Sequence, residues 1–245
     1  KMKEICFIHL GGTGVGIGNE LWNILSQESS EIDKKLTDSD LNEEDKLIYE
    51  NYNKHVCYQE VEEGKYKPRA IFADFEIQSL DTVRRSDFGS NELSDDQYIL
   101  GNTETASAYI INDDIKERVE DQFRRYAEAS DCLDNIYITH SACGGTGSAM
   151  PNLIMNLVED EGYNFTKYGT LPSPGYCDNS LEYFNSLCSI SDSLSNNTFS
   201  IYADNERCFE LLEKLGLEDP NYDDINKLLG IDLSMITAPL RYGSC

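Results

Sequence analysis

One glycine-rich segment combines residue types that suit anion binding. Residues 141–148 (SACGGTGS) contain three glycines, whose backbone N–H groups can approach a phosphate closely, together with three hydroxyl side chains. A tight turn from a strand into a helix would not need three glycines around a threonine. We therefore predict a phosphate cradle here, built from backbone amides, and its members are Ser141, Gly144, Gly145, Thr146 and Gly147.

A second glycine-rich segment, residues 11–18 (GGTGVGIG), follows the first apolar run of the chain. The dinucleotide fingerprint G-x-G-x-x-G does not fit, because its last glycine falls on Ile17 or Asn19. A G-x-x-x-x-G-K-[ST] P-loop does not occur in the sequence either. Taken alone, the segment fits either a phosphate loop or tight packing of the helix that follows it.

Two carboxylates, Asp74 and Glu76, lie two residues apart after another apolar run. Carboxylates near a phosphate would repel it unless a cation lay between them. Mg²⁺ binds one or two carboxylates together with phosphate oxygens, and it would remove this repulsion. The pair by itself is also typical of an ordinary exposed strand end.

Asn205 and Asn226 could read the polar edge of a purine, because a carboxamide carries both a donor and an acceptor. Tyr222, at the start of the last predicted helix, could stack on the base. Without further context, residues such as Asn205 and Tyr222 are more often helix-cap and packing residues.

Apolar runs alternate with helical periodicity along the chain, and this pattern positions the residues described above. Strands are predicted at 4–10, 69–75, 135–140, 167–172 and 199–203, with helices after most of them. Such alternation predicts an α/β fold with a mainly parallel sheet and helices on both faces. Ligands then bind beyond the carboxyl ends of the strands, where the candidate residues fall. Residues 28–63 are rich in charged and small polar side chains, and we predict a long solvated insertion there.

Composition excludes several classes of function. The net charge of −25 argues against a nucleic-acid partner, whose binding depends on Lys and Arg. No apolar run is long enough to cross a bilayer, and the first residues lack a signal-peptide pattern. The eight cysteines form no C-x-x-C pair, which favours reduced thiols in the cytoplasm, and the three scattered histidines do not predict a metal cluster.

Several segments together resemble the nucleotide-binding half of tubulin, and the α-tubulin branch in particular. The opening EICFIHLGGTGVGIGNELW, the loop THSACGGTGSAM and the segment LPSPGYCDNSLEYFN appear in the family's order. ADNE, PNYDDINKLLG and SMITAPLRY follow with the family's spacing. The resemblance covers residues 2–243 and is weakest in the acidic insertion.

The resemblance implies a GTP-binding domain of the tubulin/FtsZ type over residues 1–245, ending in a core helix at about 222–237. It implies a cytoplasmic, cytoskeletal subunit that binds GTP or GDP with Mg²⁺ and pairs with a β-tubulin-like partner. The first phosphate loop would be Gly11, Gly12 and Thr13, and the metal side Asp74 and Glu76. The remaining nucleotide contacts would be Ser141, Gly144, Gly145, Thr146 and Gly147 at the phosphates, Asp178 and Glu182 at the ribose, and Asn205, Tyr222 and Asn226 at guanine.

The sequence departs from the family pattern at the phosphate end. Gly12 replaces a glutamine, and residues 104–108 (ETASA) replace a segment with two asparagines that contacts the γ-phosphate. Cys143 and Ala149 stand where glycines are usual. We expect nucleotide retention with little discrimination between GTP and GDP.

The chain stops near the point where the family's second half begins, and that half supplies the acidic residue that activates water on a neighbouring subunit. No general base is evident, so we expect little or no GTP hydrolysis by this chain alone. Two alternatives are a nucleotide-free interaction module with the same fold and, from the glycines alone, a nicotinamide-dependent oxidoreductase. The latter lacks both the spacing and an acidic residue at a second strand end.

Overall fold

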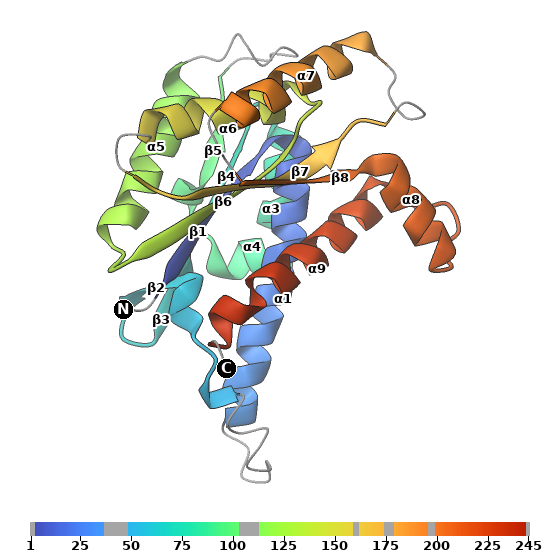
Figure 1. Ribbon diagram of the computed structural model, residues 1–245. Helices are drawn as coiled ribbons and strands as arrows, with labels where there is room; N and C mark the ends of the chain where they lie inside the picture. Colours follow the sequence, from blue (N-terminus) through green and yellow to red (C-terminus); the bar gives the residue numbers. More distant parts are fainter. Residues whose placement is uncertain are drawn as a thin grey trace.

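A six-stranded parallel sheet forms the centre of the computed structural model, which describes residues 3–36, 49–102, 113–158, 162–173, 179–195 and 199–243. The strands lie in the order β5-β4-β1-β6-β7-β8, and each neighbouring pair is parallel (Figure 1). Their bounds are β1 Glu4–Leu10, β4 Ala70–Asp74, β5 Tyr98–Leu100, β6 Leu133–Ser141, β7 Phe165–Leu171 and β8 Phe199–Asp204. The predicted α/β fold with a mainly parallel sheet is confirmed.

Helices cover both faces of this sheet (Figure 1). One face carries α1 Gly11–Leu36, α3 Ile77–Arg85, α4 Asp87–Glu92, α8 Asn205–Lys214 and α9 Tyr222–Arg241. The other carries α5 Asp113–Glu128 and α6 Gly145–Val158, with α7 Ser180–Ser195 packed beside α6. Residues of β1 alternate between the two cores, because successive side chains of a strand point to opposite faces: Phe7 joins one cluster and Ile8 the other.

The order of the sheet reverses at β1. Chain connections lead from β1 to β4 and β5 on one side and then cross to β6, β7 and β8 on the other. In open parallel sheets the crevice at such a reversal is the usual ligand site. The glycine-rich segments after β1 and β6 therefore follow adjacent strands and both begin at the carboxyl ends of those strands.

We predicted a solvated insertion at residues 28–63, and this prediction is wrong for most of that range. Helix α1 continues through Leu36, and a hairpin of β2 Tyr58–Glu62 and β3 Lys65–Pro68 follows at 58–68. Ser29 and Ile32 are buried, because they continue at helical spacing the face that begins with Leu21 and Leu25. Polar composition hid this sparse apolar face, and residues 37–48 of the insertion lie outside the described residues.

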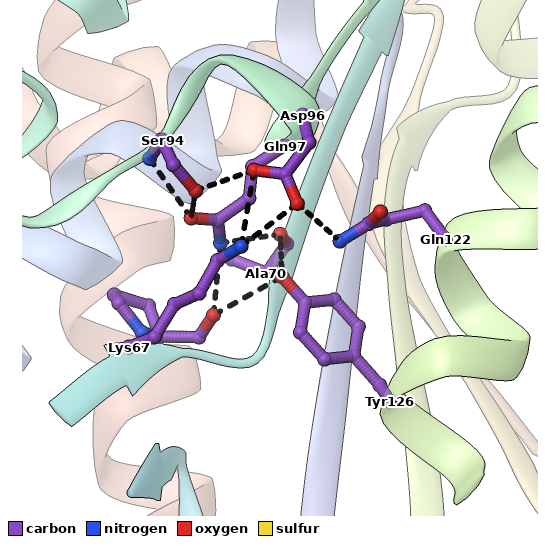
Figure 2. A network of polar contacts seen from close by, with 8 residues as sticks. Lys67, Ala70, Ser94, Asp96, Gln97, Gln122 and Tyr126 are labelled. Carbon is purple, nitrogen blue, oxygen red and sulfur yellow. Dashed lines mark hydrogen bonds and ion pairs between the residues drawn. The ribbon is translucent and has the colours of Figure 1, made fainter. Parts of the chain in front are cut away.

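The sheet edge at β5 is held by side-chain hydrogen bonds, shown in Figure 2. Gln97 and Tyr126 donate to the carbonyl oxygen of Ala70 at 2.9 and 3.2 Å. Lys67 pairs with Asp96 at 2.8 Å beside them. These bonds attach the three-residue strand β5 to β4 and α5, and β4 carries Asp74 at its end.

A buried ion pair fastens the amino ends of β1 and β4. The guanidinium of Arg69, before β4, pairs with the carboxylate of Glu4, and both side chains are almost completely buried. Arg69 also donates to the carbonyl oxygens of His55 and Tyr58 at 2.6 and 2.8 Å, while Glu4 accepts from the backbone N–H of Cys132 at 3.0 Å. The pair thus joins β1, β4 and β6 to the hairpin.

Removing one partner of this pair should destabilise the fold strongly. We expect Glu4→Ala to lower the free energy of unfolding by about 3–5 kcal/mol, because it leaves the Arg69 cation buried without its counter-charge. The control is Glu62→Ala, which breaks the exposed pair with Lys65 and should cost less than about 1 kcal/mol. Urea titrations of the three proteins measure the difference, and equal losses in both variants would contradict this role for Glu4.

Candidate functional site

A cavity of about 380 Å³ opens at the carboxyl ends of β1, β4 and β6. Every predicted site residue of the described chain lines it except Asn226, and Asp178 lies outside the described residues. Leu10, Cys143 and Pro172 also line the cavity and were not predicted as site residues. The predicted residues in its wall are Gly11, Gly12, Thr13, Asp74, Glu76, Ser141, Gly144, Gly145, Thr146, Gly147, Glu182, Asn205 and Tyr222.

The floor of the cavity is a close contact between the two glycine-rich segments. A Cβ on Gly11 would lie 3.1 Å from the backbone nitrogen of Gly147, and the φ angle of Gly11 is +71°. A Cβ on Gly147 would in turn lie 2.7 Å from the carbonyl oxygen of Ser141. Both positions therefore require glycine. A side chain at position 11 would push the end of β1 away from the start of α6, and one at position 147 would push α6 away from the end of β6.

Two other glycines in the wall have no packing reason to be glycine. A Cβ on Gly12 or Gly144 would meet no atom within 4 Å, and neither residue has a positive φ angle. Both border the cavity, so a side chain there would fill its open space and cover backbone N–H groups at the starts of α1 and α6. This arrangement fits a phosphate, which binds at helix N-termini through such amides.

The later glycines of the first segment serve packing. The segment forms the first two turns of α1, where we predicted a loop. A Cβ on Gly14 would overlap the carbonyl oxygen of Thr139, and one on Gly18 would overlap the ring of His9. The phosphate-loop interpretation therefore suits the first residues of this segment, and the tight-packing interpretation suits its later glycines.

A buried chain of hydrogen bonds supports the start of α1. The indole N–H of Trp22 donates to Nε2 of His9 at 3.0 Å, and Nδ1 of His9 lies 2.6 Å from the hydroxyl of Thr139. That hydroxyl donates to the carbonyl oxygen of Gly14 at 2.8 Å. Burial lowers the pKa of His9 to about 3, so its ring is neutral and can accept from Trp22 while donating to Thr139.

Carboxylates face the cavity, and among the described residues no Lys or Arg lines it. Asp74 is buried and accepts hydrogen bonds from the N–H of Phe75 at 2.8 Å, from Ser79 at 2.6 Å and from Thr146 at 3.1 Å. Glu76 is exposed at the start of α3, and Glu182 approaches from α7. An anionic ligand here would meet backbone amides and the hydroxyls of Thr13, Ser141 and Thr146.

No group of three or more His, Cys, Asp or Glu side chains that could hold a metal ion is present in the described part of the chain. Asp74 and Glu76 lie in the cavity wall together with the amide cradle. These two carboxylates would hold a Mg²⁺ ion, which would offset the charge of a bound phosphate.

The far end of the cavity is formed by Asn205 and Tyr222. Asn205 begins α8, and its Oδ1 is buried without a hydrogen-bond partner. The Ser173 hydroxyl holds this turn, donating to Asp204 at 2.6 Å and accepting from the N–H of Glu206 at 2.8 Å. The ring of Tyr222 is 56% exposed and packs edge to face against Phe209, with the ring centroids 5.4 Å apart.

Asn226 is the described site residue that the structure does not bring into this cavity. Its amide packs against Gly16, where a Cβ would overlap Nδ2. It lines an adjacent cavity of about 360 Å³, which shares Gly12 with the first. Sequence order alone could not show this separation, because it depends on how α9 lies against α1.

Asn185 supports the cradle and was missed by the sequence analysis. Its Nδ2 donates from α7 to the carbonyl oxygen of Cys143 at 3.1 Å. The sulfur of Cys143 in turn lies 2.9 Å from the hydroxyl oxygen of Ser141. The sequence could have indicated this role, because Asn185 follows Glu182 by three residues. That spacing places both side chains on one side of the same helix.

The fold and site together define a nucleotide-binding α/β domain in which glycine-rich helix starts take the place of a P-loop. The family model described as "Tubulin/FtsZ family, GTPase domain" matches residues 4–213. The chain therefore belongs to the tubulin/FtsZ family, and its matched domain is of the guanine-nucleotide-binding kind. Within the described residues, no helix is both long and apolar enough to span a membrane.

The buried histidine beneath the cradle should make stability depend on pH. Nδ1 of His140 bonds the carbonyl oxygen of Gly147 at 2.7 Å, and burial lowers the His140 pKa to about 4. The unfolded chain has a histidine pKa of about 6.5, so it binds the proton first and stability is lost as the pH falls below that value. Between pH 7 and pH 5 this loss is about 2 kcal/mol.

The matching measurement is urea unfolding of wild type and His140→Gln at pH 7 and pH 5. We expect the wild type to lose about 2 kcal/mol more than the variant over this interval, since glutamine does not titrate. Comparison of the two slopes cancels the titration of the many surface carboxylates. Parallel slopes would show that His140 is not held neutral in the folded protein.

Proposed function

We propose that the cavity binds GTP or GDP together with Mg²⁺. Backbone amides at the starts of α1 and α6 would hold the phosphates, assisted by the hydroxyls of Thr13, Ser141 and Thr146. Asp74 and Glu76 would hold the cation, directly or through water. The main support is that two open glycine positions border a cavity whose wall carries carboxylates and, within the described residues, no Lys or Arg.

The guanine end of the proposal rests on Asn205, Tyr222 and Asn226. Asn205 offers an unsatisfied carboxamide oxygen and Tyr222 an accessible ring. Asn226 would have to turn from Gly16 toward the first cavity, which shares Gly12 with its own. Glu182 lines the same cavity and is proposed, with Asp178, to contact the ribose.

We further propose that the protein is a divergent, α-tubulin-like structural subunit of microtubules or of an associated cytoplasmic assembly, paired with a β-tubulin-like partner. The motifs of the opening segment, the cradle and the last helix support this assignment. The domain would cover residues 1–245, with α9 as the core helix. Little GTP hydrolysis is expected from this chain by itself, because the sequence offers no evident general base to orient water.

A second candidate is a tubulin-fold interaction module without nucleotide. The contact between Asn226 and Gly16 favours it, since that asparagine lines a different cavity from Asn205. The substitution of Gly12 for the family's glutamine points in the same direction. Nucleotide measurements separate the two candidates.

Replacing the aromatic ring at the base end should weaken nucleotide binding. We expect Tyr222→Ala to lower the affinity for GDP and GTP about tenfold in isothermal titrations with Mg²⁺, because the stacking contact is lost. Tyr183→Ala, at another exposed tyrosine outside the cavity, is the control and should bind as wild type does. Wild-type protein without measurable guanine-nucleotide affinity would favour the interaction module.

A side chain in place of Gly144, the open position of the cradle, should also weaken nucleotide binding, in this case at the phosphates. We expect Gly144→Val to leave the melting temperature nearly unchanged, because a Cβ there meets no atom within 4 Å. Nucleotide affinity should fall about tenfold or more as backbone donors are covered. Gly18→Ala serves as the contrast, since its Cβ overlaps His9 and should instead destabilise the fold. Unaltered affinity in Gly144→Val would place the phosphates elsewhere.

A further inference from the structure

A second cavity lies between the second half of α1, the β2–β3 hairpin and α4, away from the nucleotide cavity. Its volume is about 640 Å³, and the two cavities share no described lining residue. The hairpin ends directly before β4, at the amino end of that strand, whereas the nucleotide cavity lies at the carboxyl ends. Ser26 is the first α1 residue in the wall and follows Gly11 by 15 residues, which is roughly 22 Å along a helix.

The wall of this cavity is built for polar contacts. Every described residue in it is polar, aromatic or glycine. Helix α1 turns one side toward it, at intervals of three, one and three residues, formed by Ser26, Ser29, Ser30 and Asp33. The volume lies in the range of small-molecule sites, so a polar molecule of modest size would fit.

The charged groups of the wall balance one another. The ammonium of Lys54 lies 3.3 Å from a carboxylate oxygen of Asp33. The carboxylate of Glu92 accepts a hydrogen bond from the hydroxyl of Ser26. Lys34 brings the second positive charge, so the described wall has no formal net charge, although the whole chain carries −25. This balance does not favour a charged ligand of either sign.

Two buried hydroxyl groups of the wall have no hydrogen-bond partner among the described residues. They are the Oγ atom of Ser29, which is 3% exposed, and the phenolic oxygen of Tyr58, which is 2% exposed. Burial and the nearby carboxylate of Glu92 raise the pKa of Tyr58 well above its usual value, so the phenol keeps its proton and can donate. Buried polar groups are nearly always paired, and these two therefore indicate that the cavity receives a hydrogen-bonding group.

The chemistry of the wall selects a neutral ligand rich in hydroxyl groups. A ligand hydroxyl both donates and accepts, so it can accept from Tyr58 or Ser29 and donate to the carboxylate of Glu92. An anion would meet the carboxylates and a cation the ammonium groups, and each would lose hydration without an unpaired counter-charge to replace it. An apolar molecule would leave both buried hydroxyls unpaired.

We propose that this cavity is a binding site for a neutral polyhydroxylated molecule, a sugar or a polyol. The hydroxyls of Ser29 and Tyr58 donate to its oxygens, and its own hydroxyls donate to Glu92. The site is separate from the nucleotide cavity, and the inference does not depend on nucleotide binding.

The test uses Ser29→Ala and Tyr58→Phe, which each remove one of the two hydroxyls. Titrations of the full chain with glucose, galactose, mannose and maltose, followed by saturation-transfer difference NMR, measure binding. We expect at least one of these sugars to bind, and each variant to weaken its affinity about threefold to tenfold through the loss of one hydrogen bond. The melting temperature of each variant should be unchanged or higher, because the deleted hydroxyl has no partner in the described fold.

The matched control is Ser189→Ala, which removes another buried hydroxyl without a described partner, in α7 and outside this cavity. It should bind the sugar as wild type does. If Tyr58→Phe does not fold, as circular dichroism would show, Ser29→Ala carries the test alone.

Three results would overturn the proposal. Failure of all four sugars to bind would mean that the cavity holds water only. Equal binding by wild type, Ser29→Ala and Tyr58→Phe would place the sugar elsewhere on the protein. Tighter binding of glucose 6-phosphate, or of glucosamine at a slightly acidic pH where its amine is protonated, than of glucose would show that the site prefers a charged ligand.

Discussion

The close approach of two backbone segments, at Gly11 and Gly147, is the constraint on which the rest of the site depends. The segments follow neighbouring strands at the reversal point of the sheet, and only glycine allows them to touch. The contact brings the starts of α1 and α6 together, so that two sets of unpaired N–H groups face one cavity. The buried rings of His9 and His140 hold these two helix starts in place from below.

The scarcity of cations shapes both the interior and the surface. Arg69, Lys167 and Arg241 are all buried: Arg69 joins strands, Lys167 orients α7, and Arg241 pairs with Glu28 to join α9 to α1. Arg69 and Arg241 each pair with a carboxylate that is itself largely buried, so these two pairs leave the charge balance of the surface unchanged. In the proposed function the site holds anions through backbone amides and a divalent ion, and the net charge of −25 favours partners that carry basic groups.

Elements with weak local patterns were the ones that the sequence analysis missed. Strand β5 has only three residues and depends on Gln97 and Tyr126 for its attachment, so no periodicity could identify it. Helices α3 and α4 are short and polar. The second half of α1 was taken for a solvated insertion because two buried residues, Ser29 and Ile32, are too few to mark a helical face among charged neighbours.

By itself, the sequence determined the α/β class, the glycine cradle and the carboxylates beside it, because these follow from local patterns of residue type and from the order of strands. Tertiary structure decided which glycines touch backbone and which are open, since that depends on distances between segments more than a hundred residues apart. It also decided that Asn226 faces Gly16 and that α7 exposes its leucines. A helical period shows that a helix has two faces, but only a buried partner such as Lys167 selects which face is inside.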